Sequence, residues 1–181
     1  ATIEQFDIGA TGDIGAIARD QLSSPLPAFY LNGKKVEGTD GAGLFVFSPD
    51  GKRWGALCTG AAGQGGGVAV IDGKRGQDYQ QGIEKIGFTA DSSKVLHIGN
   101  AGNKKFVVVD GQELPGCAIM RVPLTISERG NGWGFVGGDT LGQTSAYING
   151  KSYGPMNDIR SMFLGPDGLR RATAVAILSA N

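Results

Sequence analysis

The chain has 181 residues, of which 40% are hydrophobic, enough for a packed core and against a disordered chain. Its 17 basic and 17 acidic residues cancel to a formal net charge of zero, so a general nucleic-acid-binding surface is not expected. Glycine contributes 32 residues, more than twice the ~7% typical of proteins, and shows no collagen period. This composition predicts an all-β chain with many turns, and no apolar run approaches the ~20 residues of a membrane-spanning helix.

The first predicted strands follow closely on one another at the start of the chain. Residues 3–8 and 14–18 are predicted to form two strands, and a longer connecting loop is expected over residues 22–27. The run over residues 28–31 leads directly into Asn32-Gly33, a dipeptide that favours a type I′ hairpin turn because both residues tolerate positive φ. The sequence therefore begins with three strands and a tight turn.

The same motif, a strand followed by this turn, occurs four times. Its Asn or Asp recurs at steps of 40, 38 and 39 residues, at Asn32, Asp72, Asp110 and Asn149, and each is followed by glycine. A second acidic landmark keeps nearly the same period, with steps of 41, 37 and 39 residues between Asp50, Asp91, Glu128 and Asp167. Two landmarks in phase indicate a repeat of about 39 residues.

The third repeat gives the clearest view of one unit. Residues 83–89 alternate apolar and polar side chains, as a half-buried strand does, and residues 95–98 and 105–109 follow as a second and a third strand. The segment that continues to residue 116 is expected to add a fourth strand at the edge of the sheet. Pro115 and its counterpart Pro155 suit an edge, since proline cannot donate a hydrogen bond within a central strand.

A single β-repeat domain over residues 1–181 is therefore predicted, in five units. Their approximate bounds are residues 1–38, 39–78, 79–116, 117–155 and 156–181. The last unit supplies two strands, at residues 159–164 and 170–178, so it is expected to be about half of a unit. Four-stranded units of this length are typical of β-propeller blades. The prediction is an all-β, propeller-like ring of about five units with the last incomplete, and the alternative is an open β-repeat array or a solenoid.

The stretch Phe-Ser-Pro-Asp-Gly-Lys-Arg at residues 47–53, with Phe-Val-Val-Val-Asp-Gly at residues 106–111, resembles the WD-like repeats of bacterial TolB-type propellers. The similarity covers nearly the whole chain, although the Trp-Asp dipeptide of WD repeats is absent. The resemblance implies blade construction. The related proteins include periplasmic scaffolds and accessory domains of peptidases, so it implies a fold more firmly than a function.

No catalytic constellation, metal site or cofactor is predicted. His97 is the single histidine, and it lies between Leu96 and Ile98 in a predicted strand, where its side chain should point to the opposite face from theirs. Asp50, Asp91 and Asp167 occupy positions where a turn needs a side chain that bonds its own backbone, so a structural role is expected for them. Paired carboxylates of a glycan-active enzyme remain a third hypothesis, without an assignable pair.

Binding residues are predicted in two groups. Trp54 and Trp133 hold equivalent places at the start of a second strand, where the third unit has Val95. Their rings can stack on sugars or peptide side chains, which makes a carbohydrate-binding propeller the second hypothesis, or can fill the space between blades. The other group consists of basic residues that follow the turns, on one rim of the ring: Lys34, Lys35, Lys74, Arg75 and Lys151.

The favoured function is a non-catalytic interaction or structural module. A half-finished last unit leaves unpaired backbone groups, and a strand from another subunit is expected to complete it. The partners are therefore a protein or a second copy, or a glycan, with no nucleic acid and no membrane insertion. A chain that begins at Ala1 fits either signal-peptide removal or trimming, and a secreted or periplasmic location is predicted, with the cytoplasm left open. Cys58 and Cys117 are predicted to be small buried residues, although one disulfide between them stays open.

Overall fold

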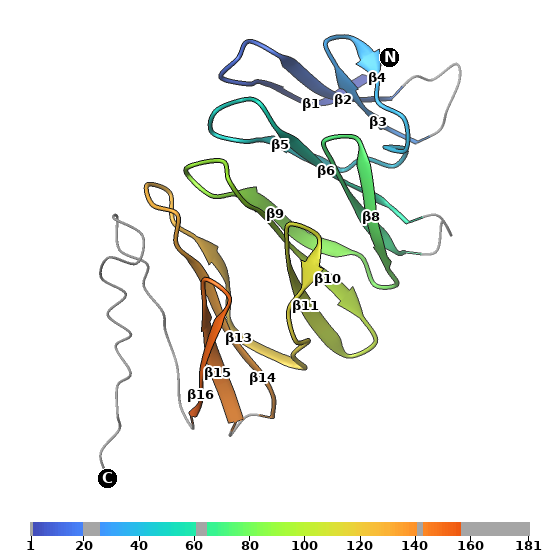
Figure 1. The fold of residues 1–181 in the computed structure, drawn as a ribbon. Coiled ribbons are helices and arrows are strands. Elements are labelled where there is room, and N and C mark those ends of the chain that lie inside the picture. Colours follow the sequence, from blue (N-terminus) through green and yellow to red (C-terminus); the bar gives the residue numbers. More distant parts are fainter. Residues whose placement is uncertain (1, 20–25, 61–64, 141–142, 157–181) are drawn as a thin grey trace.

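The computed structural model describes residues 2–19, 26–60, 65–140 and 143–156, and their regular structure consists entirely of β-strands. The strands form four antiparallel sheets of four strands each, and within each sheet the strands pair in chain order (Figure 1). The predicted all-β architecture is confirmed. Apart from residue 156, the fifth predicted unit lies outside the described residues.

Each sheet is a simple meander. The first sheet contains β1 (Thr2–Ile8), β2 (Ile14–Arg19), β3 (Ala28–Leu31) and β4 (Lys34–Lys35). The second contains β5 (Leu44–Phe47), β6 (Trp54–Thr59), β7 (Gly67–Ile71) and β8 (Lys74–Tyr79). The third contains β9 (Ile83–Phe88), β10 (Val95–Ala101), β11 (Lys104–Val109) and β12 (Gln112–Glu113). The fourth contains β13 (Ile119–Ile126), β14 (Trp133–Thr140), β15 (Gln143–Ile148) and β16 (Lys151–Met156).

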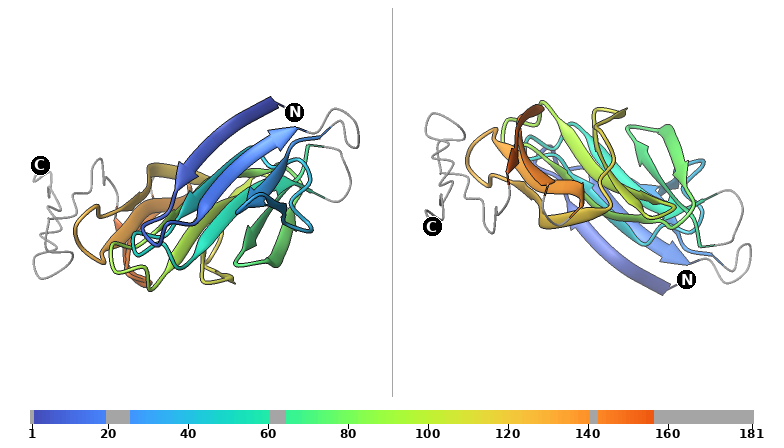
Figure 2. Two further views of the ribbon diagram at one scale, coloured as in Figure 1. Left: turned by 90° about the horizontal axis from the view of Figure 1, so that it is seen from above. Right: turned by 90° about the horizontal axis from the view of Figure 1, so that it is seen from below.

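The four sheets follow one another in chain order as a fan, with the first and the fourth at opposite ends (Figure 1). Views from above and below show β1 on one outer side of this stack (Figure 2). The described residues therefore form an open array and do not close a ring. None of them forms a helix of the length and apolarity needed to span a membrane.

Two apolar cores hold consecutive sheets together. The core between the first and second sheets is centred on buried Ile17, Phe29 and Phe45, with the Phe29 and Phe45 ring centroids 4.8 Å apart. The core between the third and fourth sheets contains buried side chains of both sheets: Leu96, Ile98, Val107, Cys117, Leu124, Trp133 and Phe135. Burial of this apolar surface is the main force that joins the sheets.

Both cysteines belong to these cores. Cys58 and Cys117 are buried and free, as predicted for small apolar residues, and they do not form a disulfide. Burial raises the pKa of the Cys58 thiol to about 12, so at neutral pH it stays protonated.

Polar side chains add ties between neighbouring sheets. The Gln5 amide on β1 donates to the carbonyl of Phe45 at 2.8 Å, and its oxygen accepts from the Phe45 N–H at 3.0 Å, so that it imitates a strand pairing with β5. Between the third and fourth sheets, the Lys85 ammonium on β9 donates to the Leu124 carbonyl on β13 at 2.8 Å. Both ties come from a side chain in the first strand of a sheet and reach the first strand of the next.

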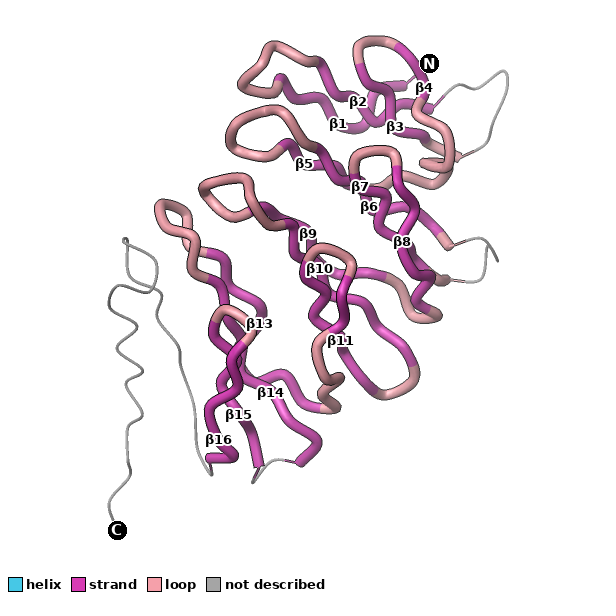
Figure 3. The backbone as a smooth tube through the Cα atoms, viewed as in Figure 1, coloured by secondary structure: helices cyan, strands magenta, loops and turns pink. Residues whose placement is uncertain are grey.

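The turns that join the first and second strands of each sheet lie in a row along one side of the fan (Figure 3). Hydrogen bonds link them in sequence. The Thr11 hydroxyl donates to the Gly51 carbonyl at 3.1 Å, and the Asp50 N–H donates to the Ser92 hydroxyl at 3.0 Å. The Asp91 N–H then donates to the Asn131 amide oxygen at 3.0 Å. The acidic landmark of the sequence is thus part of the contact between successive sheets.

Candidate functional site

The four Asx-Gly turns have the predicted type I′ character. Their Asn or Asp residues have φ values between 48° and 50°, and each following glycine also has positive φ. In every sheet the side-chain oxygen of this residue accepts a hydrogen bond from the backbone N–H that begins the second strand. The donors and acceptors are Ile14 and Asn32 at 2.8 Å, Trp54 and Asp72 at 2.9 Å, Val95 and Asp110 at 3.0 Å, and Trp133 and Asn149 at 2.9 Å. The residue that donates this N–H, the first of the second strand, is therefore equivalent in all four sheets, and we call it the slot residue.

The slot residue of the second, third and fourth sheets points toward the preceding sheet. Trp54 packs on Phe29 of the first sheet, with ring centroids 4.8 Å apart, and Trp133 lies in the core that faces the third sheet. Because Trp133 is only 3% exposed, its ring has no free face on which a sugar could stack. Both tryptophans thus lie between sheets, as the space-filling interpretation of these residues predicts. They lie in different interfaces and do not form one site.

The third sheet has a smaller slot residue, Val95, and here a cleft separates it from the second sheet. Its cavity volume is about 320 Å³. One side of the cleft consists of Arg53 just before β6, the end of β7, the following turn and β8, and the other side of residues of β10, β11 and the following turn. The lining residues are Arg53, Ile71, Asp72, Lys74, Arg75, Gly76, Gln77, Tyr79, Val95, His97, Val108, Asp110 and Gly111. Two predicted binding residues, Lys74 and Arg75, therefore meet in one concave site.

His97 lies on the wall of this cleft formed by the third sheet. It pairs in register with Val108 and Ile86, whereas its neighbours Leu96 and Ile98 face the core with the fourth sheet, as predicted. The imidazole is 4% exposed, and its Nδ1 has no hydrogen-bond partner among the described residues. Burial lowers the pKa of His97 to about 4, so the ring is neutral at pH 7.

Tyr79 lies on the opposite wall, at the end of β8. Its ring is 6.3 Å from that of His97, edge to face, and covers Gly99 of β10, where any side chain would collide with it. The Tyr79 hydroxyl donates to the carboxylate of Glu113 on β12. Burial, together with this carboxylate, raises the pKa of Tyr79, so the phenol keeps its proton.

Charged groups at the mouth of the cleft are mostly paired. Arg53 donates to Asp72 at 2.9 Å, and its guanidinium also lies 5.4 Å from the Phe88 ring centroid. Arg75 pairs with Asp78 at 2.8 Å. On the third sheet Asp110 accepts from Lys94 at 3.2 Å. Among the described residues that line the cleft, Lys74 is the cation without an ion pair.

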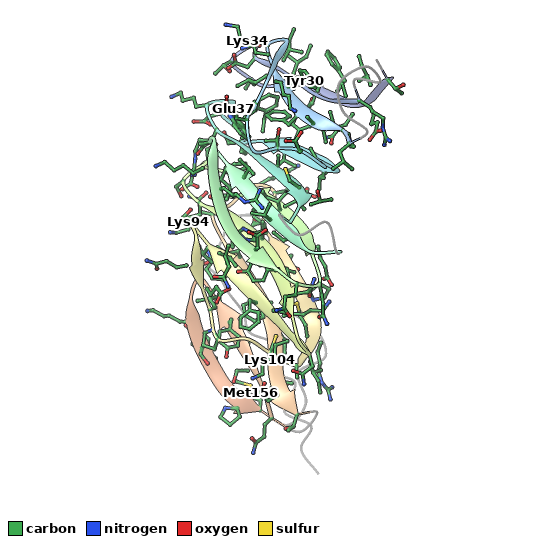
Figure 4. All side chains as sticks on the ribbon, turned by 90° about the vertical axis from the view of Figure 1, so that its right-hand side faces the viewer. Tyr30, Lys34, Glu37, Lys94, Lys104 and Met156 are labelled. Atoms are coloured by element: carbon green, nitrogen blue, oxygen red, sulfur yellow. The ribbon has the colours of Figure 1, made fainter. Side chains whose placement is uncertain are left out.

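The other basic residues predicted for the rim do not reach this cleft. Lys34 and Lys35 form β4 at the end of the array (Figure 4), and Lys35 pairs with Asp40 at 2.7 Å. Lys151 begins β16 in the fourth sheet. These residues share the post-turn position with Lys74, but they are distributed over different sheets.

The turn aspartates hold their own backbone, which agrees with the structural role predicted for them. Asp50 accepts from the Ser48 hydroxyl at 2.6 Å and from the Lys52 N–H at 3.1 Å, and these hydrogen bonds lower its pKa. Asp91 has the same arrangement with Thr89, and its pKa is lowered for the same reason. The remaining landmark, Asp167, lies outside the described residues. Within the described part of the chain, no three His, Cys, Asp or Glu side chains are grouped to hold a metal ion.

Sequence reasoning did not assign Tyr79, His97 or Arg53 to a binding site. A usable signal was the change at the slot position, because valine in place of tryptophan removes a large side chain from the space between two sheets. The contribution of Tyr79 had no such signal, since its partner Gly99 is 20 positions further along the chain.

Among the comparisons with known proteins, a similarity to one solved structure supports the fold. No protein-family model matches the chain, and no curated protein matches it. The β-propeller domain of the Trilobed protease from Pyrococcus furiosus, reported to have an open velcro topology, is similar with a TM-score of 0.55 and 13% identity, over 84% of this chain and 56% of that one. The fold is that of an open, incomplete β-propeller with four described blades. A eukaryotic initiation factor matches with a TM-score of 0.48 and 12% identity, over 92% of this chain and 59% of that one.

The chain therefore spans less than two thirds of either solved structure. At these identities the likeness concerns the fold alone. The narrower resemblance to WD-like, TolB-type repeats stays a prediction.

Proposed function

We propose that the chain is a non-catalytic propeller module that associates with a second copy of itself through the outward face of its first sheet. The observation that carries this proposal is an exposed apolar surface on β1 and β2. Phe6 is 56% exposed and Ile8 57% exposed, and Ile3 and Ile14 are also largely uncovered. Exposed apolar groups that are contiguous in this way are typical of interaction surfaces.

Strand register places these side chains on one face. Phe6 pairs with Ala16, and Ile8 with Ile14. A bulge between Ile3 and Gln5 pairs Ile3 with Ala18, so Ile3 shares the face of the other three side chains. The alternate residues of β1 point to the opposite face, where Gln5 reaches β5 of the second sheet. The exposed residues thus form one apolar patch, which we call the outer face of the first sheet.

The outer face corresponds to a surface that is covered in the other sheets. Ile14 is the slot residue of the first sheet, equivalent to Trp54 and Trp133, which both pack against a preceding sheet. Blades of a propeller bury both faces against neighbours around the axis. Among the described residues no sheet precedes the first one, so its outer face has the composition of a blade interface without a described blade against it.

A second copy is a suitable occupant. The outer face of a second copy offers the same apolar side chains, as the isologous interface of a two-fold dimer requires. The formal net charge of zero imposes no general repulsion between copies. Completion of the last unit by a strand from another subunit is a second route to assembly, and it concerns residues 157–181, outside the described part of the chain.

The absence of catalysis is part of the same proposal. His97 is the single histidine of the sequence, and its Nδ1 has no hydrogen-bond partner among the described residues. Both cysteine thiols are buried with raised pKa values, which disfavours the reactive thiolate.

Sedimentation velocity over a range of concentrations tests the assembly. The mass of the natural chain is expected to rise with concentration, whereas a variant with Phe6→Asp and Ile8→Asp is expected to stay monomeric, because a buried carboxylate opposes association. Leu44→Asp is the matched control, since Leu44 is also exposed, at 37%, but lies on the second sheet. Circular dichroism verifies that each variant is folded.

The proposal is contradicted if the natural chain remains monomeric at high concentration. It is also contradicted if the variant with Phe6→Asp and Ile8→Asp assembles like Leu44→Asp. Removal of residues 170–181 separates the two routes. Assembly through the outer face survives this truncation, whereas assembly through the last unit is lost.

A further inference from the structure

We propose that the cleft between the second and third sheets binds a small carboxylate ligand that carries an apolar group. In this arrangement Lys74 meets the carboxylate, the wall of Val95 and Val108 meets the apolar group, and His97 offers a hydrogen bond at the base. The site is separate from the outer face of the first sheet, and it is independent of whether the chain self-associates.

The imidazole of His97 is the first reason to expect a ligand. It is 96% buried, counting from its 4% exposure, and Nδ1 has no partner among the described residues. Buried polar atoms are rarely left unsatisfied, because the lost hydrogen bond with water is costly. Nδ1 itself is shielded, but the ring lines the cleft, so a polar group of a ligand that inserts beside the ring can supply the missing partner.

The size and apolar lining of the cleft are the second reason. A cavity volume of about 320 Å³ lies at the lower end of the range for small-molecule sites. Ile71 of β7, with Val95 and Val108 of the third sheet, supplies an apolar wall. Trp54 fills the equivalent space between the first and second sheets, and Trp133 fills it between the third and fourth sheets. A flat ring or a short alkyl group of a ligand therefore fits the space that Val95 leaves open.

The charge distribution is the third reason and selects the ligand class. Arg53 and Arg75 are neutralised by acidic partners, and Lys94 neutralises Asp110, whereas Lys74 has no ion pair with any described residue. One unpaired cation suits one carboxylate. A dianionic phosphate is less well matched, because only one cation among the described lining residues is without an ion pair to offset its two charges.

This chemistry has two sources, a free organic acid and the C-terminus of a peptide that ends in an apolar residue. Phenylacetate serves as the probe for the first source, and N-acetyl-glycyl-phenylalanine for the second. The C-terminal amide of the same dipeptide keeps the apolar group but removes the charge, and it therefore isolates the contribution of the carboxylate.

Nuclear magnetic resonance of the single histidine ring gives the readout. At concentrations up to the order of 10 mM, as small ligands of this size require, at least one acid is expected to shift the His97 ring resonances in a saturable way. Lys74→Met should weaken that binding about tenfold or more, because it removes a charge-assisted hydrogen bond. Lys34→Met is the matched control, since Lys34 follows the equivalent turn of the first sheet outside the cleft.

The outcomes decide among the parts of the proposal. A saturable shift that Lys74→Met weakens and Lys34→Met preserves supports the site, and the probe that binds more tightly identifies the source. No saturable shift with either acid overturns the proposal, as does equal binding of the acid and the amide. Equal affinity of the natural chain and Lys74→Met also overturns it.

Discussion

Lowering the pH from 7 to 5 is expected to destabilise the protein through His97. Burial between two sheets lowers the pKa of this imidazole to about 4, whereas a histidine in the unfolded chain titrates near its ordinary value of 6.5. Below pH 6.5 the unfolded chain therefore takes up a proton that the folded chain does not. Stability is highest above pH 6.5, falls as the pH drops, and reaches its full loss from this group below about pH 4.

The size of the effect follows from the two pKa values. One pKa unit corresponds to about 1.4 kcal/mol, so the full difference is worth about 3 kcal/mol, and the part expressed between pH 7 and pH 5 is about 2 kcal/mol. Hydrogen bonds lower the pKa values of Asp50 and Asp91 below 3.8, so these carboxylates keep their charge in both states over this range. These two aspartates therefore add little to the pH dependence over this interval, and variants of His97 isolate the contribution of the imidazole.

Urea denaturation at the two pH values measures the effect. The natural chain should lose about 2 kcal/mol between pH 7 and pH 5, and His97→Leu should lose much less, because no other histidine is present. His97→Phe serves as a second variant in case leucine packs poorly. A histidine resonance that titrates near pH 6.5 in the folded protein would refute the reasoning, as would equal pH dependence in the natural chain and both variants.

Two further substitutions test the contacts between sheets. Gln5→Glu removes the N–H donor to β5 and is expected to cost about 1–3 kcal/mol of unfolding free energy, whereas the exposed neighbour Glu4→Gln should cost no more than about 1 kcal/mol. Equal costs in urea denaturation would contradict this role of Gln5. Gly99→Ala places a methyl group against the Tyr79 ring and should cost about 1–3 kcal/mol with a change in the near-ultraviolet circular dichroism. An unchanged melting temperature and spectrum would show that the ring is not held there.

The turns were predictable because their chemistry is local. Asn32 and its three counterparts adopt the positive φ that Asn-Gly and Asp-Gly favour, and no distant residue is needed to explain it. The period of these turns then predicted units of four strands. Their side chains also bond the start of the second strand, which the sequence did not indicate.

The cleft was only partly predictable because it depends on how sheets face each other. Lys74 and Arg75 were assigned from their position after a turn, and the structure adds His97 and Tyr79 from opposite walls. Their proximity arises from packing between units, which a repeat period does not predict. Trp54 shows the same limitation, since alternation and spacing do not distinguish a ring that fills an interface from one that faces solvent.

The side-chain ties described for Gln5 and Lys85 join consecutive sheets, and so do the two apolar cores. Folding cooperativity in such an array passes from neighbour to neighbour, and a terminal sheet with one neighbour is held less firmly than an inner sheet. A partner that covers the outer face of the first sheet would act as a second neighbour and, by mass action, raise the stability of the sheets behind it. Binding of a partner to the first sheet would thereby lower the frequency with which the array of sheets unfolds.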